Sequence, residues 1–248
     1  MKDFANILFS GPCNRACPFC IGKQLPAVVN ENNLKRFPLT NIDGFIDRIN
    51  HFQIKQLVFT GTISDPQLYK YQQELIDYMR ERISYPVTFS IHSNGALTLK
   101  QIDTFNHYDK SALSFPSFVP DTYHKMMGGS PPDLAAIVKA ATIEVKVSAI
   151  INQHNLHEID DFIARCADIG IKRLVLRKLF NETRDWPILQ QYEPDYTYRS
   201  NPVYTIKGMQ VTYWNFNSTE STSINLFPNG MIGEEYLLTE AEGLQTTA

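Results

Sequence analysis

Short apolar runs alternate with longer amphipathic stretches through the first 180 residues, and this alternation limits the fold more than any other feature. It is typical of βα units joined into a parallel sheet. The expected strands are Phe4–Ser10, Gln56–Thr60, Val87–His92, Ser111–Phe115, Ile143–Ile151 and Arg173–Leu179. The expected helices are Asn41–Phe52, Pro66–Ile83, Thr98–His107, Pro131–Ala141 and Leu156–Ile169. Six such units predict an α/β fold, either a partial (β/α)6 parallel barrel or a flat doubly wound sheet, which the alternation alone does not separate.

The third and fifth expected strands favour the barrel, because polar and apolar side chains alternate along them. Thr88, Ser90 and His92 alternate with apolar residues on the third strand, as do Lys146 and Ser148 on the fifth. Fully buried parallel strands usually read as continuous apolar runs. In a barrel the apolar set would face the helices and the polar set would line the interior. We therefore expect a polar interior, with a half-solvated sheet as the alternative.

The sequence changes character after Phe180. Residues 181–202 are rich in Pro, Tyr and charge, which indicates an irregular linker. Three short strands follow, at Val203–Ile206, Met209–Trp214 and Ser223–Phe227, and a Pro-Asn-Gly turn leads into a fourth over 231–237. We expect a core domain over 1–180 and a small C-terminal antiparallel β extension over 203–238 that closes the barrel mouth. The last residues, 239–248, read as a flexible tail.

Composition excludes several classes of function. The 248 residues are 43% hydrophobic, enough to form the core of one barrel-sized domain. A net charge of −3 offers no electrostatic footprint for nucleic acid. No run approaches the ~20 apolar residues of a membrane span, and the N-terminus lacks the apolar stretch of a signal peptide. We therefore expect a cytoplasmic protein that binds neither nucleic acid nor a membrane.

Three of the four cysteines lie in one short segment, Cys13-Asn-Arg-Ala-Cys17-Pro-Phe-Cys20, after a Ser-Gly-Pro break that ends the first strand. Thiolates crowded in this way repel one another and normally bind a soft metal or an iron–sulfur cluster. The remaining cysteine, Cys166, lies far along the chain in a helical segment. A [4Fe-4S] cluster on three thiolates would keep one iron open, and an open position is typical of catalytic metal sites.

Two other interpretations of these cysteines compete with a cluster. A zinc site would need a fourth Cys or His at short spacing, but the nearest histidine is His51. A thioredoxin-like redox pair would use Cys17 and Cys20 at the start of a helix, and it leaves Cys13 unexplained. An iron–sulfur cluster accounts for all three thiols.

The spacing C-x3-C-x-aromatic-C resembles the radical S-adenosylmethionine (SAM) superfamily. The resemblance implies that Cys13, Cys17 and Cys20 hold one [4Fe-4S] cluster, and that the open iron chelates the amino and carboxylate groups of SAM. An electron from the cluster then splits SAM, and the resulting 5′-deoxyadenosyl radical abstracts hydrogen from a substrate. Phe19 stands where the family places a residue that packs near adenine. The resemblance also implies a partial barrel and an electron donor such as flavodoxin or ferredoxin.

Further matches extend through most of the first 180 residues. In place of the family's Gly-Gly-Glu-Pro, which holds the SAM amino group, this chain has Thr60-Gly61-Thr62-Ile63-Ser64-Asp65-Pro66. Gly61 and Thr62 are the expected backbone contacts, and Asp65 either supplies the charge or only caps the following helix. Asn94 and Ser114 follow the third and fourth strands, where relatives bind SAM. Arg177, at the end of the sixth strand, is expected either to contact a carboxylate of SAM or substrate or to point outward.

The spacing of Asp121, His124 and Gly128 and the late Pro-Asn-Gly turn resemble the molybdopterin-cyclase-like branch. That branch often has further cysteines for an auxiliary cluster, and this sequence has none, which implies a single cluster. Cys166 is expected to be a buried, inert thiol.

These features predict a radical SAM enzyme that abstracts hydrogen from a small polar metabolite. Only twelve residues precede Cys13, so we expect no leader-binding domain. The aromatic, acidic extension is expected to close over an amine-bearing molecule or simply to pack on the barrel. A peptide-modifying radical SAM enzyme and a non-catalytic iron–sulfur redox or sensor protein are the alternatives.

Overall fold

The computed structural model describes residues 2–25, 27–219 and 221–234. Its centre is a run of six parallel strands that lie side by side in chain order. They are β1 (Phe4–Phe9), β2 (Gln56–Gly61), β3 (Thr88–Ser93), β4 (Lys110–Ser114), β5 (Glu144–Ile150) and β6 (Arg173–Arg177). The predicted α/β class with a mostly parallel sheet is confirmed.

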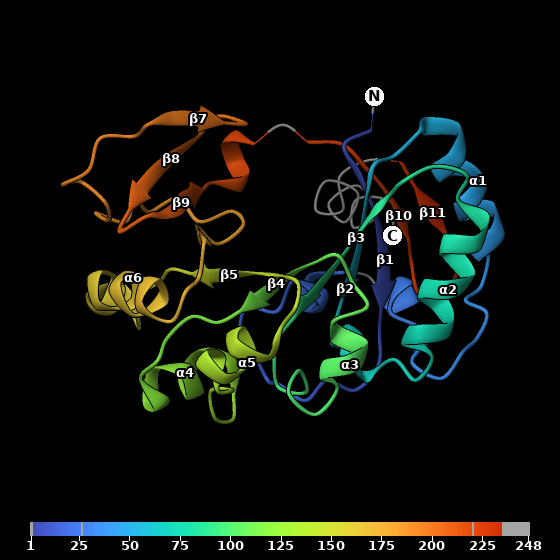
Figure 1. The fold of residues 1–248 in the computed structure, drawn as a ribbon, viewed down its shortest axis with the longest axis horizontal. Coiled ribbons are helices and arrows are strands. Elements are labelled where there is room, and N and C mark those ends of the chain that lie inside the picture. Colours follow the sequence, from blue (N-terminus) through green and yellow to red (C-terminus); the bar gives the residue numbers. More distant parts are fainter. Residues whose placement is uncertain (1, 26, 220, 235–248) are drawn as a thin grey trace.

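Helices connect these strands and surround the outer side of the sheet (Figure 1). They are α1 (Ile42–Phe52), α2 (Gln72–Arg82), α3 (Ile102–Phe105), α4 (Pro120–Met127), α5 (Leu134–Ala140) and α6 (Ile159–Asp168). Single turns of 3-10 helix occur at η1 (Ile21–Gln24), η2 (Ala27–Val29), η3 (Pro66–Leu68), η4 (Leu156–Glu158) and η5 (Phe216–Ser218). No helix in the described ranges combines the length and apolarity that crossing a bilayer requires.

Helix α1 illustrates how the sequence sets these elements. Ile42, Phe45, Ile46 and Ile49 recur at helical spacing and are all buried, so one stripe of the helix packs on the sheet. The helix ends where Gln53 adopts a left-handed conformation with φ 54°. Fully burying each such side chain contributes about 1.5–3 kcal/mol.

The two faces of the parallel strands differ as the alternation predicts. Phe89 and Ile91 of β3 and Val145, Val147 and Ala149 of β5 belong to the buried cluster that includes the helices. Because successive side chains point to opposite faces, the polar set, with His92 and Lys146 among it, lies on the face turned away from the helices. We call this the inner face of the sheet.

The C-terminal strands continue the sheet at both of its edges, whereas the sequence predicted one small antiparallel extension over 203–238. An antiparallel meander of β7 (Tyr196–Tyr198), β8 (Asn201–Ile206) and β9 (Met209–Trp214) joins one edge, with β9 parallel to β6. β10 (Ser223–Leu226) returns to the other edge and pairs parallel with β1, and β11 (Ile232–Gly233) folds back on it. Within the described residues the sheet therefore has eleven strands.

Long-range pairing explains this difference. Asn6 of β1 donates a buried hydrogen bond of 2.7 Å to Asn225 of β10, a contact that local sequence does not reveal. The segment 181–202, expected as a linker, contains β7 and the start of β8. Helix α4 and the short α3 also depart from the expected helices. The predicted tail, 239–248, lies outside the described residues, as do 235–238 of the expected extension.

Candidate functional site

The three-cysteine segment leaves β1 at its carboxyl end. Ser10 is fully buried there; its amide donates to Asn33 Oδ1 at 3.0 Å and its hydroxyl donates to the Asn30 carbonyl at 2.9 Å. Asn33 Nδ2 in turn donates to the Leu8 carbonyl at 3.0 Å. These bonds fasten both ends of the loop to the end of the strand, so the cysteines start from a fixed point.

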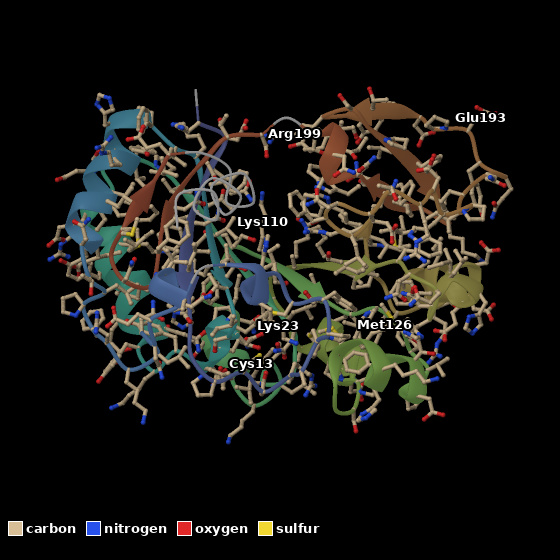
Figure 2. All side chains as sticks on the ribbon, turned by 180° about the vertical axis from the view of Figure 1, so that it is seen from behind. Cys13, Lys23, Lys110, Met126, Glu193 and Arg199 are labelled. Atoms are coloured by element: carbon tan, nitrogen blue, oxygen red, sulfur yellow. The ribbon has the colours of Figure 1, made fainter. Side chains whose placement is uncertain are left out.

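The three thiols have different neighbours. Cys20 Sγ lies 3.5 Å from the Thr62 carbonyl oxygen, and Cys17 Sγ lies 3.8 Å from the Met127 carbonyl oxygen and 3.6 Å from its sulfur. Cys13 is exposed, whereas Cys17 and Cys20 are partly buried. Figure 2 shows Cys13 in the lower part of the molecule together with Met126 of α4, with Lys110 of β4 above them.

The chemistry of this donor set fits an iron–sulfur cluster. Burial and the charges of Cys20 and Cys13 raise the pKa of Cys17 to about 11, and burial raises the pKa of Cys13. Close thiolates of this kind are stabilised by a cation that neutralises them. In the described part of the chain, no three Cys, His, Asp or Glu side chains are arranged around a common metal position. The three thiols share one loop, but their side chains are not arranged around one point. To hold a cluster, these side chains would have to turn toward one another.

Four polar contacts hold the cysteine loop against the neighbouring strands. Asn94 Nδ2, after β3, donates to Asn14 Oδ1 at 2.7 Å, and Ser64 Oγ, after β2, donates to the Pro12 carbonyl at 3.0 Å. On the other side, the Ala16 amide donates to the Met127 carbonyl at 2.9 Å and Arg15 donates to the Ser130 carbonyl at 3.0 Å. The loop is thus fixed to the carboxyl ends of β2 and β3 and to the end of α4.

Two glycines permit this close packing. A Cβ on Gly22 would lie 2.4 Å from the Thr62 carbonyl oxygen, and one on Gly61 would lie 1.6 Å from the Ser64 carbonyl oxygen. Both contacts are with backbone, which cannot move aside as a side chain can. Thr62 is buried, and its amide and hydroxyl both donate to the Phe9 carbonyl. Gly61 and Thr62 therefore shape the loop that receives the cysteine segment.

Asp65 joins the loops after β2 and β3 beside the cysteine segment. It is 4% exposed, and its carboxylate accepts hydrogen bonds from the Gln67 amide at 2.9 Å and the Asn94 amide at 2.6 Å. The Ser93 hydroxyl lies 3.0 Å from the same carboxylate. Burial raises the pKa of Asp65, against the lowering effect of these amides. The hydrogen bond from the Gln67 amide is that of the predicted helix cap, and the Asp65 charge also contributes to raising the pKa of Cys13.

The other predicted residues fall into two groups. Asn94 is buried and directed at the cysteine loop through Asn14, so it positions that loop. Phe19 packs partly buried against the core. Ser114 is exposed at the carboxyl end of β4, and Arg177, at the end of β6, has its guanidinium carbon 5.7 Å from the centre of the Phe216 ring. Ser114 and Arg177 lie on the inner face.

Sequence reasoning gave no role to several residues of the site. Asn14 and Arg15 stand between the cysteines without a motif of their own, yet they make contacts to the β3 and α4 loops. Lys146 and His92 were expected on the polar face, without a function. Burial and the nearby charges of Lys146 and Arg177 lower the pKa of His92 well below its ordinary value, so the imidazole is neutral at pH 7.

The fold resembles that of several solved structures. Streptococcus suis SuiB aligns with 93% of this chain and 60% of its own, at 12% identity and a TM-score of 0.62. SuiB bound to S-adenosylmethionine aligns with 75% of this chain and 41% of its own, at 13% identity and a TM-score of 0.55. Histidine-tagged anSMEcpe with bound AdoMet aligns with 74% of this chain and 55% of its own, at 13% identity and a TM-score of 0.57.

At these identities the likeness concerns the fold alone. This chain spans about half the length of the structures that it matches. No family profile matches the sequence, and no curated protein matches it either.

Proposed function

We propose that this protein is a radical SAM enzyme that uses one [4Fe-4S] cluster to cleave S-adenosylmethionine reductively and to abstract hydrogen from a small polar metabolite. The three-cysteine loop carries the proposal, because it is fastened at the carboxyl end of β1 and packed between loops from β2, β3 and α4. Ligands of parallel α/β folds bind at this edge of the sheet. The fold is shared with structures that contain S-adenosylmethionine, which supports the same assignment.

The residues of the site have distinct roles in this proposal. Cys13, Cys17 and Cys20 hold the cluster, which when bound supplies the electron for cleavage. Asn94 holds the loop through Asn14, and Gly61 and Thr62 form the backbone next to it. Because Asp65 is occupied by internal amides, backbone carbonyls of the loop after β2 are left to hold the amino group of S-adenosylmethionine. An electron donor such as flavodoxin or ferredoxin completes the reaction.

The proposal is tested on protein reconstituted with iron and sulfide without oxygen. Dithionite and S-adenosylmethionine should yield 5′-deoxyadenosine, and Cys13→Ala, Cys17→Ala and Cys20→Ala should each abolish it. Cys166→Ala is the matched control, because this thiol is fully buried in the core away from the loop. A stable cluster that forms no 5′-deoxyadenosine would instead indicate an electron carrier or sensor, and binding of one zinc ion would indicate a structural site.

A peptide substrate is the second candidate, and one observation favours it. Solved structures with this fold contain peptides: SuiB is bound to the precursor peptide SuiA, and anSMEcpe is bound to AdoMet and the Kp18Cys peptide. Incubating the reduced enzyme with a peptide pool and with a pool of small polar metabolites, and then comparing 5′-deoxyadenosine formation, separates the two substrate classes.

A further inference from the structure

The inner face of the parallel strands carries an excess of positive charge. On this face, β4, β5 and β6 present four basic side chains, from Lys110, Lys146, Arg173 and Arg177, and the only acidic side chain of β1–β6 on it is Glu144. The protein as a whole has a net charge of −3, so this excess is local. Charges of one sign gathered on the interior of a sheet attract ligands of the opposite sign.

Strand register places Lys146 at the same level of this face as His92 of β3. Ala112 of β4 pairs with His92 on one side and with Lys146 on the other, so these two lie at the same level of the sheet. On β6 the residue opposite Lys146 is Arg173, and Arg177, opposite Ile150, lies on the same face nearer the carboxyl end. The charges of Lys146 and Arg177 both act on His92, and Arg177 exerts the largest effect of any charge on Lys146. We call Lys146, Arg177 and His92 the cationic set.

Lys146 is held in this position at an energetic cost. Burial lowers its pKa to about 8, and Arg177, Arg173 and Lys110 contribute to the lowering, whereas only Glu144 acts in the opposite sense. Glu144 itself lies 3.6 Å from Arg173. Within residues 2–25, 27–219 and 221–234, no carboxylate comes within ion-pair distance of Lys146. Lys146 is partly buried. Charges withdrawn from water are normally paired, and an ionised group kept in this way is typical of a binding site.

We propose that the cationic set binds an anionic group of the substrate, a carboxylate or a phosphate. The ammonium of Lys146 and the guanidinium of Arg177 supply charged donors, which suit such groups, and the neutral imidazole of His92 adds one further hydrogen bond. This inference rests on the proposed function and names its substrate class. It replaces the expected amine-bearing molecule, because an ammonium group would be repelled by the same charges.

The anion is assigned to the substrate rather than to S-adenosylmethionine for two reasons. Lys146 lies on β5, four strands along the sheet from β1 and the cysteine loop, a path of roughly 19 Å along the sheet at about 4.8 Å per strand. The sulfonium of S-adenosylmethionine is itself positive, and its carboxylate is the group expected to chelate the open iron, which leaves the cationic set for another anion. A separate small molecule with its own negative charge could lie at this distance from the cysteine loop and would be attracted by the cationic set.

The experiment is isothermal titration calorimetry without oxygen on cluster-loaded protein, with inorganic phosphate and with malonate as probes, each with and without saturating S-adenosylmethionine. We expect one anion per chain, with binding retained in the presence of S-adenosylmethionine. The stronger of the two probes identifies the group as phosphate or carboxylate. Lys146→Met and Arg177→Met should each weaken binding at least about tenfold, the usual effect of losing one charged donor.

Lys139→Met, on the exposed side of α5, is the matched control and should bind as the wild type does. Lys146→Arg keeps the charge and should restore binding, and circular dichroism checks that each variant is folded. The proposal is overturned if neither probe binds, if the variants bind as well as the wild type, or if S-adenosylmethionine displaces the anion. Formation of 5′-deoxyadenosine on the same protein is scored separately, so either claim can fail without the other.

Discussion

Replacing Lys146 with methionine is expected to stabilise the protein at neutral pH, although it removes a group that we assign to substrate binding. In the folded protein, burial and then the charges of Arg177 and Arg173 lower the pKa of Lys146 from 10.5 to about 8. One pKa unit corresponds to about 1.4 kcal/mol. Keeping this ammonium charged therefore costs about 3 kcal/mol at pH 7, and methionine, of similar length and uncharged, should recover most of it.

The pH dependence of this effect has a definite sign. A lysine whose folded-state pKa is lowered destabilises the folded protein by the full amount at pH values below that pKa, which is about 8 here. Between pH 8 and 10.5 the folded protein loses this proton while the unfolded chain still keeps it, so the penalty shrinks. By pH 10 the advantage of methionine should fall to about 1 kcal/mol.

Urea unfolding of the wild type and Lys146→Met at pH 7 and pH 10 measures both values. The exposed Lys139→Met variant is the control, and it should change the free energy of unfolding by less than about 0.5 kcal/mol. The reasoning is refuted if Lys146→Met is no more stable than the wild type at pH 7, or if its gain is the same at both pH values.

Three further outcomes follow from the same structure. Asp65→Asn should lower the free energy of unfolding by about 1–3 kcal/mol, because one of the amides of Gln67 and Asn94 then faces a donor instead of an acceptor; unchanged urea unfolding would contradict the bridging role. Gly61→Ala should cost more than about 2 kcal/mol, since its Cβ would meet the Ser64 carbonyl at 1.6 Å. At Gly208 an added Cβ would have no atom within 4 Å, but φ is +73°, so Gly208→Ala should cost only about 1 kcal/mol. Equal losses of stability in the two variants would argue against the steric explanation. Anion binding measured by calorimetry should weaken as the pH rises above about 8, where Lys146 loses its proton; binding that stays constant up to pH 10 would exclude a role for this ammonium.

The parallel strands could be predicted from the sequence because each is either a short apolar run or a strict polar–apolar alternation, a pattern that is set locally. All six lie within one or two residues of the expected bounds. Helix α4 gave no comparable signal. It is only eight residues long, and its buried residues include the polar Thr122. The three residues of β7 are all exposed, so no apolar pattern marked them.

The pairing of strands and the roles of site residues depend on contacts between distant segments. The place of β10 beside β1 involves the Asn6–Asn225 bond, across 219 residues of chain. The spacing of the cysteines located the loop, whereas the role of Asp65 could be decided only once the Asn94 amide was known to lie 2.6 Å from it. Lys146 was visible as a polar residue of an alternating strand, but its importance comes from Arg177 on the next strand.

Electron paramagnetic resonance tests the central claim most directly, namely that three cysteines leave one iron of the cluster open to S-adenosylmethionine. We predict that the oxygen-free, dithionite-reduced protein gives a [4Fe-4S] signal whose g values shift when S-adenosylmethionine is added. A cluster with four protein ligands, whose spectrum is the same with and without S-adenosylmethionine, would contradict the account.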